Sequence, residues 1–156
     1  MPQQHIDPRY AQFFLDTCAF DPKYSPEHES AAAIWKLHEE EVLNLVLAHS
    51  NQREIDHPNT PSWVRSQAAQ MIYTLPVSLT QEELSRLDAL LKLLRGNSIS
   101  NQNDDDARHI FEASKYGAFF LTTDRRILRL TSRIYDLCSV QVMKPSEAIA
   151  RIGSRA

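Results

Sequence analysis

The stretch AFFLTTDRRILRLTSRIYDLCSVQVM, residues 118–143, decides the fold class. Its first six residues predict a strand, residues 125–135 predict a helix, and residues 139–143 predict a second strand. Asp124 stands between the first strand and the helix, where a carboxylate can cap the helix N-terminus. Strand, helix and strand in this order are typical of a βαβ unit, in which the two strands run parallel.

The same alternation of short apolar runs and longer amphipathic segments continues over the rest of the chain. It predicts further strands at 13–18, at 43–49 and, as a short edge strand, at 75–79. It predicts further helices at 28–42, 62–72, 81–95, 104–116 and from 145 onward. We therefore predict an α/β fold, with residues 1–156 forming a single three-layer domain around a central, mostly parallel sheet flanked by helices.

Several helix boundaries and faces follow from local signals. Thr80 followed three residues later by Glu83 is a capping box, and Gly96 is expected to end the helix that begins there. Leucines at helical spacing predict the buried face of this helix: Leu84, Leu87, Leu91 and Leu94. In the helix at 28–42, the pattern predicts burial of Ala32, Ile34, Trp35 and either Leu37 or His38.

Composition excludes several classes of function. A formal net charge of -3 argues against a general polyanion binder, because such affinity comes mainly from Lys and Arg on phosphates. With three glycines, the chain has no Gly-rich loop for nucleotide phosphates. Cys18 and Cys138 fit neither a disulfide framework nor zinc spacing, and because both lie beside apolar residues they are predicted to be buried free thiols. The chain has neither a signal-peptide pattern nor an apolar run long enough for a membrane span, and a cytoplasmic location is expected.

Four acidic residues stand where strands end or a helix begins. Asp16 follows Phe13-Phe14-Leu15, Glu54 follows the second predicted strand, Asp106 opens a helical segment, and Asp124 follows the strand at 118–123. The carboxyl ends of parallel strands meet at one edge of a sheet, so these carboxylates are expected to converge. Such a pocket is stable near neutral pH only with a bound cation or shifted pKa values. The pattern predicts a Mg²⁺ or Mn²⁺ site.

Structural alternatives exist for each of these groups. Asp124 is a good N-cap, and the run Asp104-Asp105-Asp106 suits a helix start without any metal. His109, one turn after Asp106, could ligate a metal, but its apolar neighbours favour a semi-buried, hydrogen-bonded histidine. Arginines at i, i+4 and i+8 form either a solvated helix face or a basic rim that contacts phosphates: Arg125, Arg129 and Arg133.

Taken in order, these short motifs resemble a PIN domain, most closely the VapC-like ribonucleases of toxin–antitoxin systems. The resemblance is carried by Phe13-Phe14-Leu15-Asp16-Thr17, Glu54, Asp106-Ala107-Arg108-His109 and Phe120-Leu121-Thr122-Thr123-Asp124. It implies metal-dependent cleavage of single-stranded RNA, a homodimer and an antitoxin partner. It assigns catalytic metal binding to Asp16, Glu54, Asp106 and Asp124, and substrate contacts to Thr17 and Thr123, with Arg125 at the proposed basic rim. Asp106 is preferred within its run because it begins the Asp-Ala-x-His string.

Three other readings compete with a nuclease. A phosphatase with an aspartyl nucleophile usually has a second Asp two residues later, where this chain has Cys18. A phospho-receiver domain would have paired acids before its acceptor and a Lys after a later strand, and neither is evident. A PIN-like module without catalysis, acting as a binding or scaffold protein, is the non-enzyme alternative. The four acids in order argue against that alternative.

Overall fold

Five strands form one parallel sheet in the part of the chain that the structure, a computed structural model, describes: residues 6–7, 11–16, 27–47, 62, 72–73, 78–96, 104–116 and 119–152. The strands are β1 (Gln12–Leu15), β2 (Asn44–Leu47), β3 (Ile72–Tyr73), β4 (Phe119–Leu121) and β5 (Gln141–Met143). Their order in the sheet is β3-β2-β1-β4-β5, and each neighbouring pair is parallel. The predicted α/β fold is confirmed.

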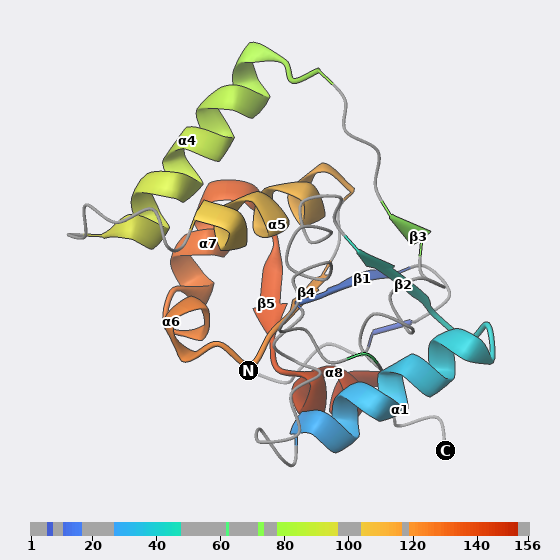
Figure 1. Cartoon of the computed structure of the whole chain (residues 1–156). Helices are drawn as coiled ribbons and strands as arrows, with labels where there is room; N and C mark the ends of the chain where they lie inside the picture. Colours follow the sequence, from blue (N-terminus) through green and yellow to red (C-terminus); the bar gives the residue numbers. More distant parts are fainter. Residues whose placement is uncertain are drawn as a thin grey trace.

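Helices cover both faces of this sheet and make it the middle of three layers (Figure 1). The described helices are α1 (Glu27–Glu39), α4 (Gln81–Arg95), α5 (Asp104–Lys115), α6 (Arg125–Leu128), α7 (Thr131–Cys138) and α8 (Pro145–Ile152). Helices α1 and α8 pack against each other on one face. Helices α4 to α7 cover the other face, where α4 packs on α5 and α7.

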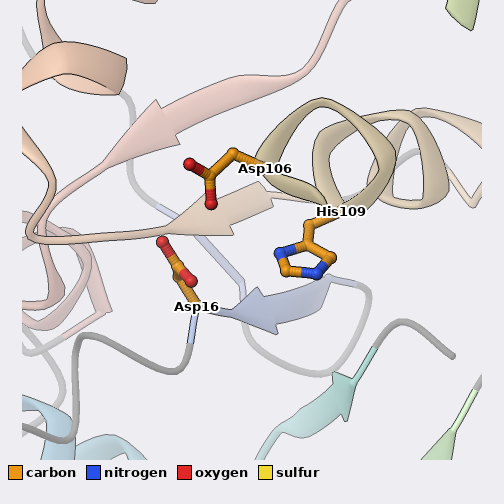
Figure 2. Close-up of side chains that lie close together, drawn as sticks. All are labelled: Asp16, Asp106 and His109. Carbon is orange, nitrogen blue, oxygen red and sulfur yellow. The ribbon is translucent and has the colours of Figure 1, made fainter. Parts of the chain in front are cut away.

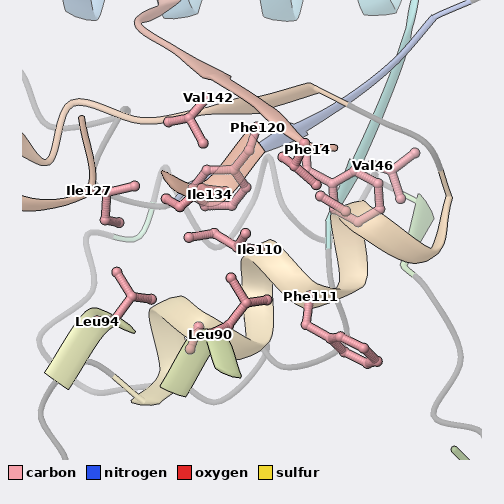
Figure 3. Close-up of a cluster of buried hydrophobic side chains, with 13 residues drawn as sticks. Phe14, Val46, Leu90, Leu94, Ile110, Phe111, Phe120, Ile127, Ile134 and Val142 are labelled. Atoms are coloured by element: carbon pink, nitrogen blue, oxygen red, sulfur yellow. The ribbon is translucent and has the colours of Figure 1, made fainter. Parts of the chain in front are cut away.

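Alternation along β1 divides the apolar core into two clusters. Successive side chains of a strand point to opposite faces, so Phe13 and Leu15 face α1 and α8 while Phe14 faces α5. Figure 3 shows the second cluster, in which Phe14 and Phe120 of the sheet lie over Ile110 of α5. Phe13, Phe14, Phe120 and Ile110 are each at most 1% exposed. The strands that carry the functional site are thus fixed from both sides.

The helix caps that the sequence predicts are present at α4. The Thr80 hydroxyl accepts from the Glu83 backbone N–H at 3.2 Å, and the Glu83 carboxylate accepts from the Thr80 N–H at 2.9 Å. This capping box is confirmed, and its backbone hydrogen bond holds the pKa of Glu83 below its ordinary value. The helix ends at Gly96, whose φ of 56° suits a residue without Cβ.

The single helix predicted at 125–135 is wrong. Residues 125–138 form two helices, α6 and α7, separated at Arg129 and Leu130. The Thr131 hydroxyl donates to the Leu128 carbonyl at 2.7 Å, an acceptor that a continuous helix would offer to the Ser132 N–H. This competition between side chain and backbone accounts for the break.

The edge strand lies earlier than predicted. Ile72, predicted to end a helix, begins β3 and pairs with Val46, whereas residues 78–80 belong to no strand. A β-branched and an aromatic residue favour a strand at 72–73, and residues 75–77 of the predicted strand lie outside the described residues.

Two predicted helix faces also need correction. Ala31 is buried with Ile34 and Trp35, because i, i+3 and i+4 share a face, and Ala32 is exposed. Leu84 is 46% exposed, and burial in α4 is concentrated at Leu90 and Leu94.

Cys138 is a free thiol, as predicted, but it is half-buried rather than buried. Burial raises its pKa, and it donates to the Ile134 carbonyl at 3.2 Å. Among the described helices, none has the length and apolarity that a bilayer crossing requires. Cys18, the predicted helix over residues 63–71 and the C-cap at Gly117 lie outside the described residues.

Candidate functional site

The sheet has a topological switch point between β1 and β4. These strands are neighbours in space, but the chain leaves β1 toward β2 and β3 and leaves β4 toward β5, on the opposite side. In open parallel sheets a crevice opens at such a point, beyond the carboxyl ends of the strands. Asp16 directly follows β1, and Thr122, Thr123 and Asp124 directly follow β4. The topology therefore brings these side chains to the edge where α/β proteins bind ligands.

Asp16 is held in place by the strand beside it. Its backbone N–H donates to the Leu121 carbonyl at 2.9 Å, which extends the ladder between β1 and β4 by one bond. The Thr122 hydroxyl donates to the Asp16 Oδ2 atom at 2.8 Å. Asp16 is only 4% exposed, so this hydroxyl compensates part of the cost of burying a carboxylate.

Helix α5 contributes two further groups to the same place. Asp106 and His109 are three residues apart and share one face of the helix. Asp16, Asp106 and His109 each offer one ligand atom, and these atoms all lie within 4.8 Å of one another. Figure 2 shows the side chains of Asp106 and His109, both from α5, directed toward Asp16. The arrangement is a compact set of two carboxylates and one imidazole.

Within the acidic run that begins α5, two of the three carboxylates are paired with arginines. Arg95 donates to both oxygens of Asp104, at 2.8 and 2.6 Å, and thereby holds the pKa of Asp104 below its ordinary value. Asp105 pairs with Arg108 at 3.1 Å. Asp106 is the member of the run that lies beside Asp16 and His109. This geometry agrees with the preference for Asp106 as the functional acid.

His109 differs from the histidine predicted at this position. It is fully buried rather than semi-buried, and among the described residues neither ring nitrogen has a hydrogen-bond partner. The prediction of a hydrogen-bonded histidine is therefore wrong. A buried polar group without a partner costs roughly 1–3 kcal/mol, so a fold rarely retains one without compensation. Such a group beside two carboxylates is expected where a ligand completes the site.

Asp124 lies at the same edge of the sheet, but it is engaged elsewhere. One of its oxygens accepts from the Arg126 backbone N–H at 2.9 Å and caps α6, and the other pairs with the Arg126 guanidinium at 3.2 Å. The Asp124 carboxylate raises the pKa of Arg126, and Asp106 adds to this effect through its charge. The structural alternative that the sequence offered for Asp124, an N-cap, is thus present. Its role as a metal ligand stays a prediction.

The structure describes only some of the other predicted site residues. Glu54 and Thr17 lie outside the described residues. Thr123 is buried and Arg125 is exposed at the first residue of α6. Arg125, Arg129 and Arg133 are all exposed, but the break between α6 and α7 prevents them from forming one helical face. Arg125 and Arg126 begin α6, directly after Asp124, whereas Arg133 lies on α7, and a basic rim that contacts phosphates stays a prediction.

Thr122 belongs to the candidate site, although the sequence did not single it out. Its hydroxyl donates to Asp16 and accepts from the Asp124 backbone N–H at 3.0 Å, so it links the ends of β1 and β4. The alternation of side chains along a strand could have indicated this residue. Thr122 is two residues after Phe120, which places both on the face of the sheet that α5 covers. Its partner 106 residues away in the sequence could not be identified from spacing.

Comparisons with known proteins identify no family. No protein-family model matches the chain, and no curated protein matches it at a significant level.

Proposed function

We propose that the chain is a metal-dependent endoribonuclease that cleaves single-stranded RNA, as its resemblance to PIN domains implies. The observation that supports this proposal best is the convergence of Asp16, Asp106 and His109 within 4.8 Å at the carboxyl end of the sheet. Two acids from segments ninety residues apart in the chain serve no common packing purpose there, because like charges at this distance repel.

The side chains suit a divalent cation. Carboxylate oxygens are the ligands that Mg²⁺ and Mn²⁺ prefer, and the buried ring nitrogens of His109 still need a partner. Asp16 and Asp106 would hold the ion, with Asp124 and Glu54 as further acidic ligands. A bound ion would lower the pKa of water and neutralise charge on the phosphate.

The protein's own groups would then orient the reactants. Hydrolysis forms one P–O bond from water and breaks another, and the water proton ends on the leaving oxygen. Thr122 fixes the Asp16 carboxylate, so that this acceptor does not rotate when substrate enters. Asp106 is the more accessible of the two acids, and it can accept a hydrogen bond from the attacking water. Preorganised carboxylates of this kind supply electrostatic catalysis without reorganising during the reaction.

RNA would approach past the exposed arginines that begin α6. Arg125 is free of any ion pair in the described part of the chain, while Arg126 is held by Asp124 beside the cluster. Guanidinium groups there can contact backbone phosphates, which fixes the register of the strand without reading its sequence. A net charge of -3 over the chain makes this local basic rim the place where electrostatic attraction for RNA would arise. A homodimer and an antitoxin partner belong to the same proposal.

The test is RNA cleavage by the purified chain with a fluorescent single-stranded RNA. We expect cleavage with Mg²⁺ or Mn²⁺ and none in EDTA, with activity restored when the ion is added back. A duplex of the same sequence should be resistant. Cleavage that persists in EDTA would contradict the metal mechanism. Metal-dependent binding of RNA without cleavage would instead favour a binding module that lacks catalysis.

A further inference from the structure

His109 is the most unusual polar group in the described part of the molecule. Its side chain is fully buried, and both ring nitrogens lack a partner there. His38 shows the ordinary alternative in the same fold: its Nδ1 atom accepts from the Leu45 N–H at 3.2 Å, and its ring packs against Trp35. These contacts satisfy the Nδ1 atom of His38, whereas neither ring nitrogen of His109 has a partner among the described residues.

The position of His109 limits which ligand could satisfy its ring nitrogens. One of its ring nitrogens lies within 4.8 Å of carboxylate oxygens from both Asp16 and Asp106. Ligand atoms around one small cation are about 3 Å apart when each lies about 2.1 Å from the ion, so modest side-chain rotations would close this set on an ion. A water molecule could satisfy one nitrogen, but it would not reduce the repulsion between the two neighbouring carboxylates.

We propose that His109 supplies a nitrogen ligand to the metal centre, and that the centre therefore selects a first-row transition ion such as Mn²⁺ over Mg²⁺. Mg²⁺ is a hard ion that takes oxygen ligands almost exclusively, whereas imidazole nitrogen suits transition metals. A mixed set of two carboxylates and one imidazole accommodates Mn²⁺ well. This inference rests on the metal site of the proposed function, but it does not depend on the cleavage of RNA.

The first experiment uses the unaltered chain, freed of any affinity histidines, with Mn²⁺ as the probe. Pulsed electron paramagnetic resonance detects the nuclear spin of a nitrogen bound directly to Mn²⁺. We expect a ¹⁴N signal that changes to the ¹⁵N pattern when the protein is labelled with ¹⁵N-histidine. A bound Mn²⁺ without any nitrogen coupling would overturn the proposal, because an all-oxygen centre leaves His109 outside the coordination sphere.

The second experiment assigns the nitrogen to His109 and measures selectivity. His109→Gln replaces the imidazole by an amide, and His38→Gln is the matched control on α1. Losing a group that supports a metal typically costs 10–100-fold in affinity, so His109→Gln should weaken Mn²⁺ binding by at least ~10-fold and remove the ¹⁴N signal. Its Mg²⁺ affinity should change far less, which lowers the preference for Mn²⁺. His38→Gln should keep both the preference and the signal.

The outcomes separate this inference from the proposed function. A nitrogen-coupled Mn²⁺ centre in a chain that cuts no RNA supports the His109 ligand and contradicts the nuclease. RNA cleavage with an ion that shows no nitrogen coupling supports the nuclease and overturns the His109 ligand. An equal loss of Mg²⁺ and Mn²⁺ affinity in a folded His109→Gln variant also overturns it, since selectivity would then have another source.

Discussion

The two faces of the sheet bury different kinds of side chain. The face under α1 and α8 is closed by an apolar cluster, and a half-buried side-chain contact joins its two helices: Glu27 accepts from the Ser146 N–H and hydroxyl at 2.9 and 2.6 Å. The buried polar residues of the described chain all lie in α5 or directly after β1 or β4: Asp16, Asp104, His109, Glu112, Thr122 and Thr123. Burial of polar groups is costly, so their concentration in α5 and at the ends of β1 and β4 makes this part of the molecule the candidate for a functional site.

The largest expected difference between the faces is in activity. Asp16→Asn should lower RNA cleavage by at least ~10²-fold, the scale at which one electrostatic catalytic group contributes. Glu27→Gln, an equivalent change of an acid on the other face, should leave the rate unchanged because its carboxylate accepts from Ser146 of α8, away from the cluster. Initial rates under saturating metal test the comparison. Equal losses from both variants would mean that the acids act through stability alone.

The hydrogen bonds of Thr122 should contribute more to the free energy of unfolding than the hydrogen bond of Ser146 on the opposite face of the sheet. Thr122→Val leaves the Asp16 oxygen and the Asp124 N–H without their shared partner, and should destabilise the fold by about 1–3 kcal/mol. Ser146→Ala removes a half-buried bond to Glu27 and should cost about 0.5–1.5 kcal/mol. Urea unfolding of both variants gives the two values. A larger loss for Ser146→Ala would reverse the assignment of the buried polar network.

The cluster should be a stability liability when no ion is bound. At an effective dielectric near 20, two ionised carboxylates at about 4.8 Å repel by roughly 3–4 kcal/mol before solvent relaxation. Asp106→Asn should therefore raise the metal-free stability by about 1 kcal/mol, or about 2–4 °C in Tm. In millimolar Mn²⁺ the order should reverse, because the ion stabilises the folded wild type by mass action.

Asp105→Asn is the matched control for that experiment, since Asp105 is the next residue and pairs with Arg108 away from the cluster. It should show no rise in Tm in EDTA. If Asp106→Asn instead melts below the wild type in EDTA, Asp106 stabilises the start of α5 and repulsion within the cluster is not important.

The smallest expected effect concerns Asp104, a buried acid of α5 outside the cluster. The Arg95 hydrogen bonds hold the pKa of Asp104 below its ordinary 3.8, so folding favours the ionised form. The stabilisation is fully present above the unfolded-state pKa and is lost as the pH falls through the lower folded-state pKa. Asp104→Asn should therefore differ from the wild type by a constant amount above about pH 5, and the difference should shrink below about pH 4.

Unfolding curves across this pH range test the effect. Arg95→Gln is the control, because it removes the same ion pair by changing the arginine instead of the aspartate. Cleavage by Asp104→Asn should stay near the wild-type rate. An essential Asp104 beside a dispensable Asp106 would move the functional acid by two residues along the run.

Local signals predicted much of this molecule because they depend on neighbours in the sequence. The capping box at Thr80 and Glu83, the helix stop at Gly96 and the strands around Phe14 and Phe120 all formed as expected. The break between α6 and α7 was missed because the hydroxyl of Thr131 competes for one backbone carbonyl, a choice that apolar periodicity does not reveal. The exposure of Leu84 was missed because helical spacing alone does not show which part of an apolar stripe another element covers.

The sequence by itself determined the α/β class, the alternation that turns Asp16 toward α5, and the candidate acids at the ends of strands. Those properties follow from periods of two and 3.6 residues. Only the tertiary structure decided which acids meet. It paired Asp104 with Arg95 and Asp124 with Arg126, and it left Asp106 and His109 beside Asp16. Charge and spacing are the same for all three acids of the run, and only the contacts across the switch point distinguish them.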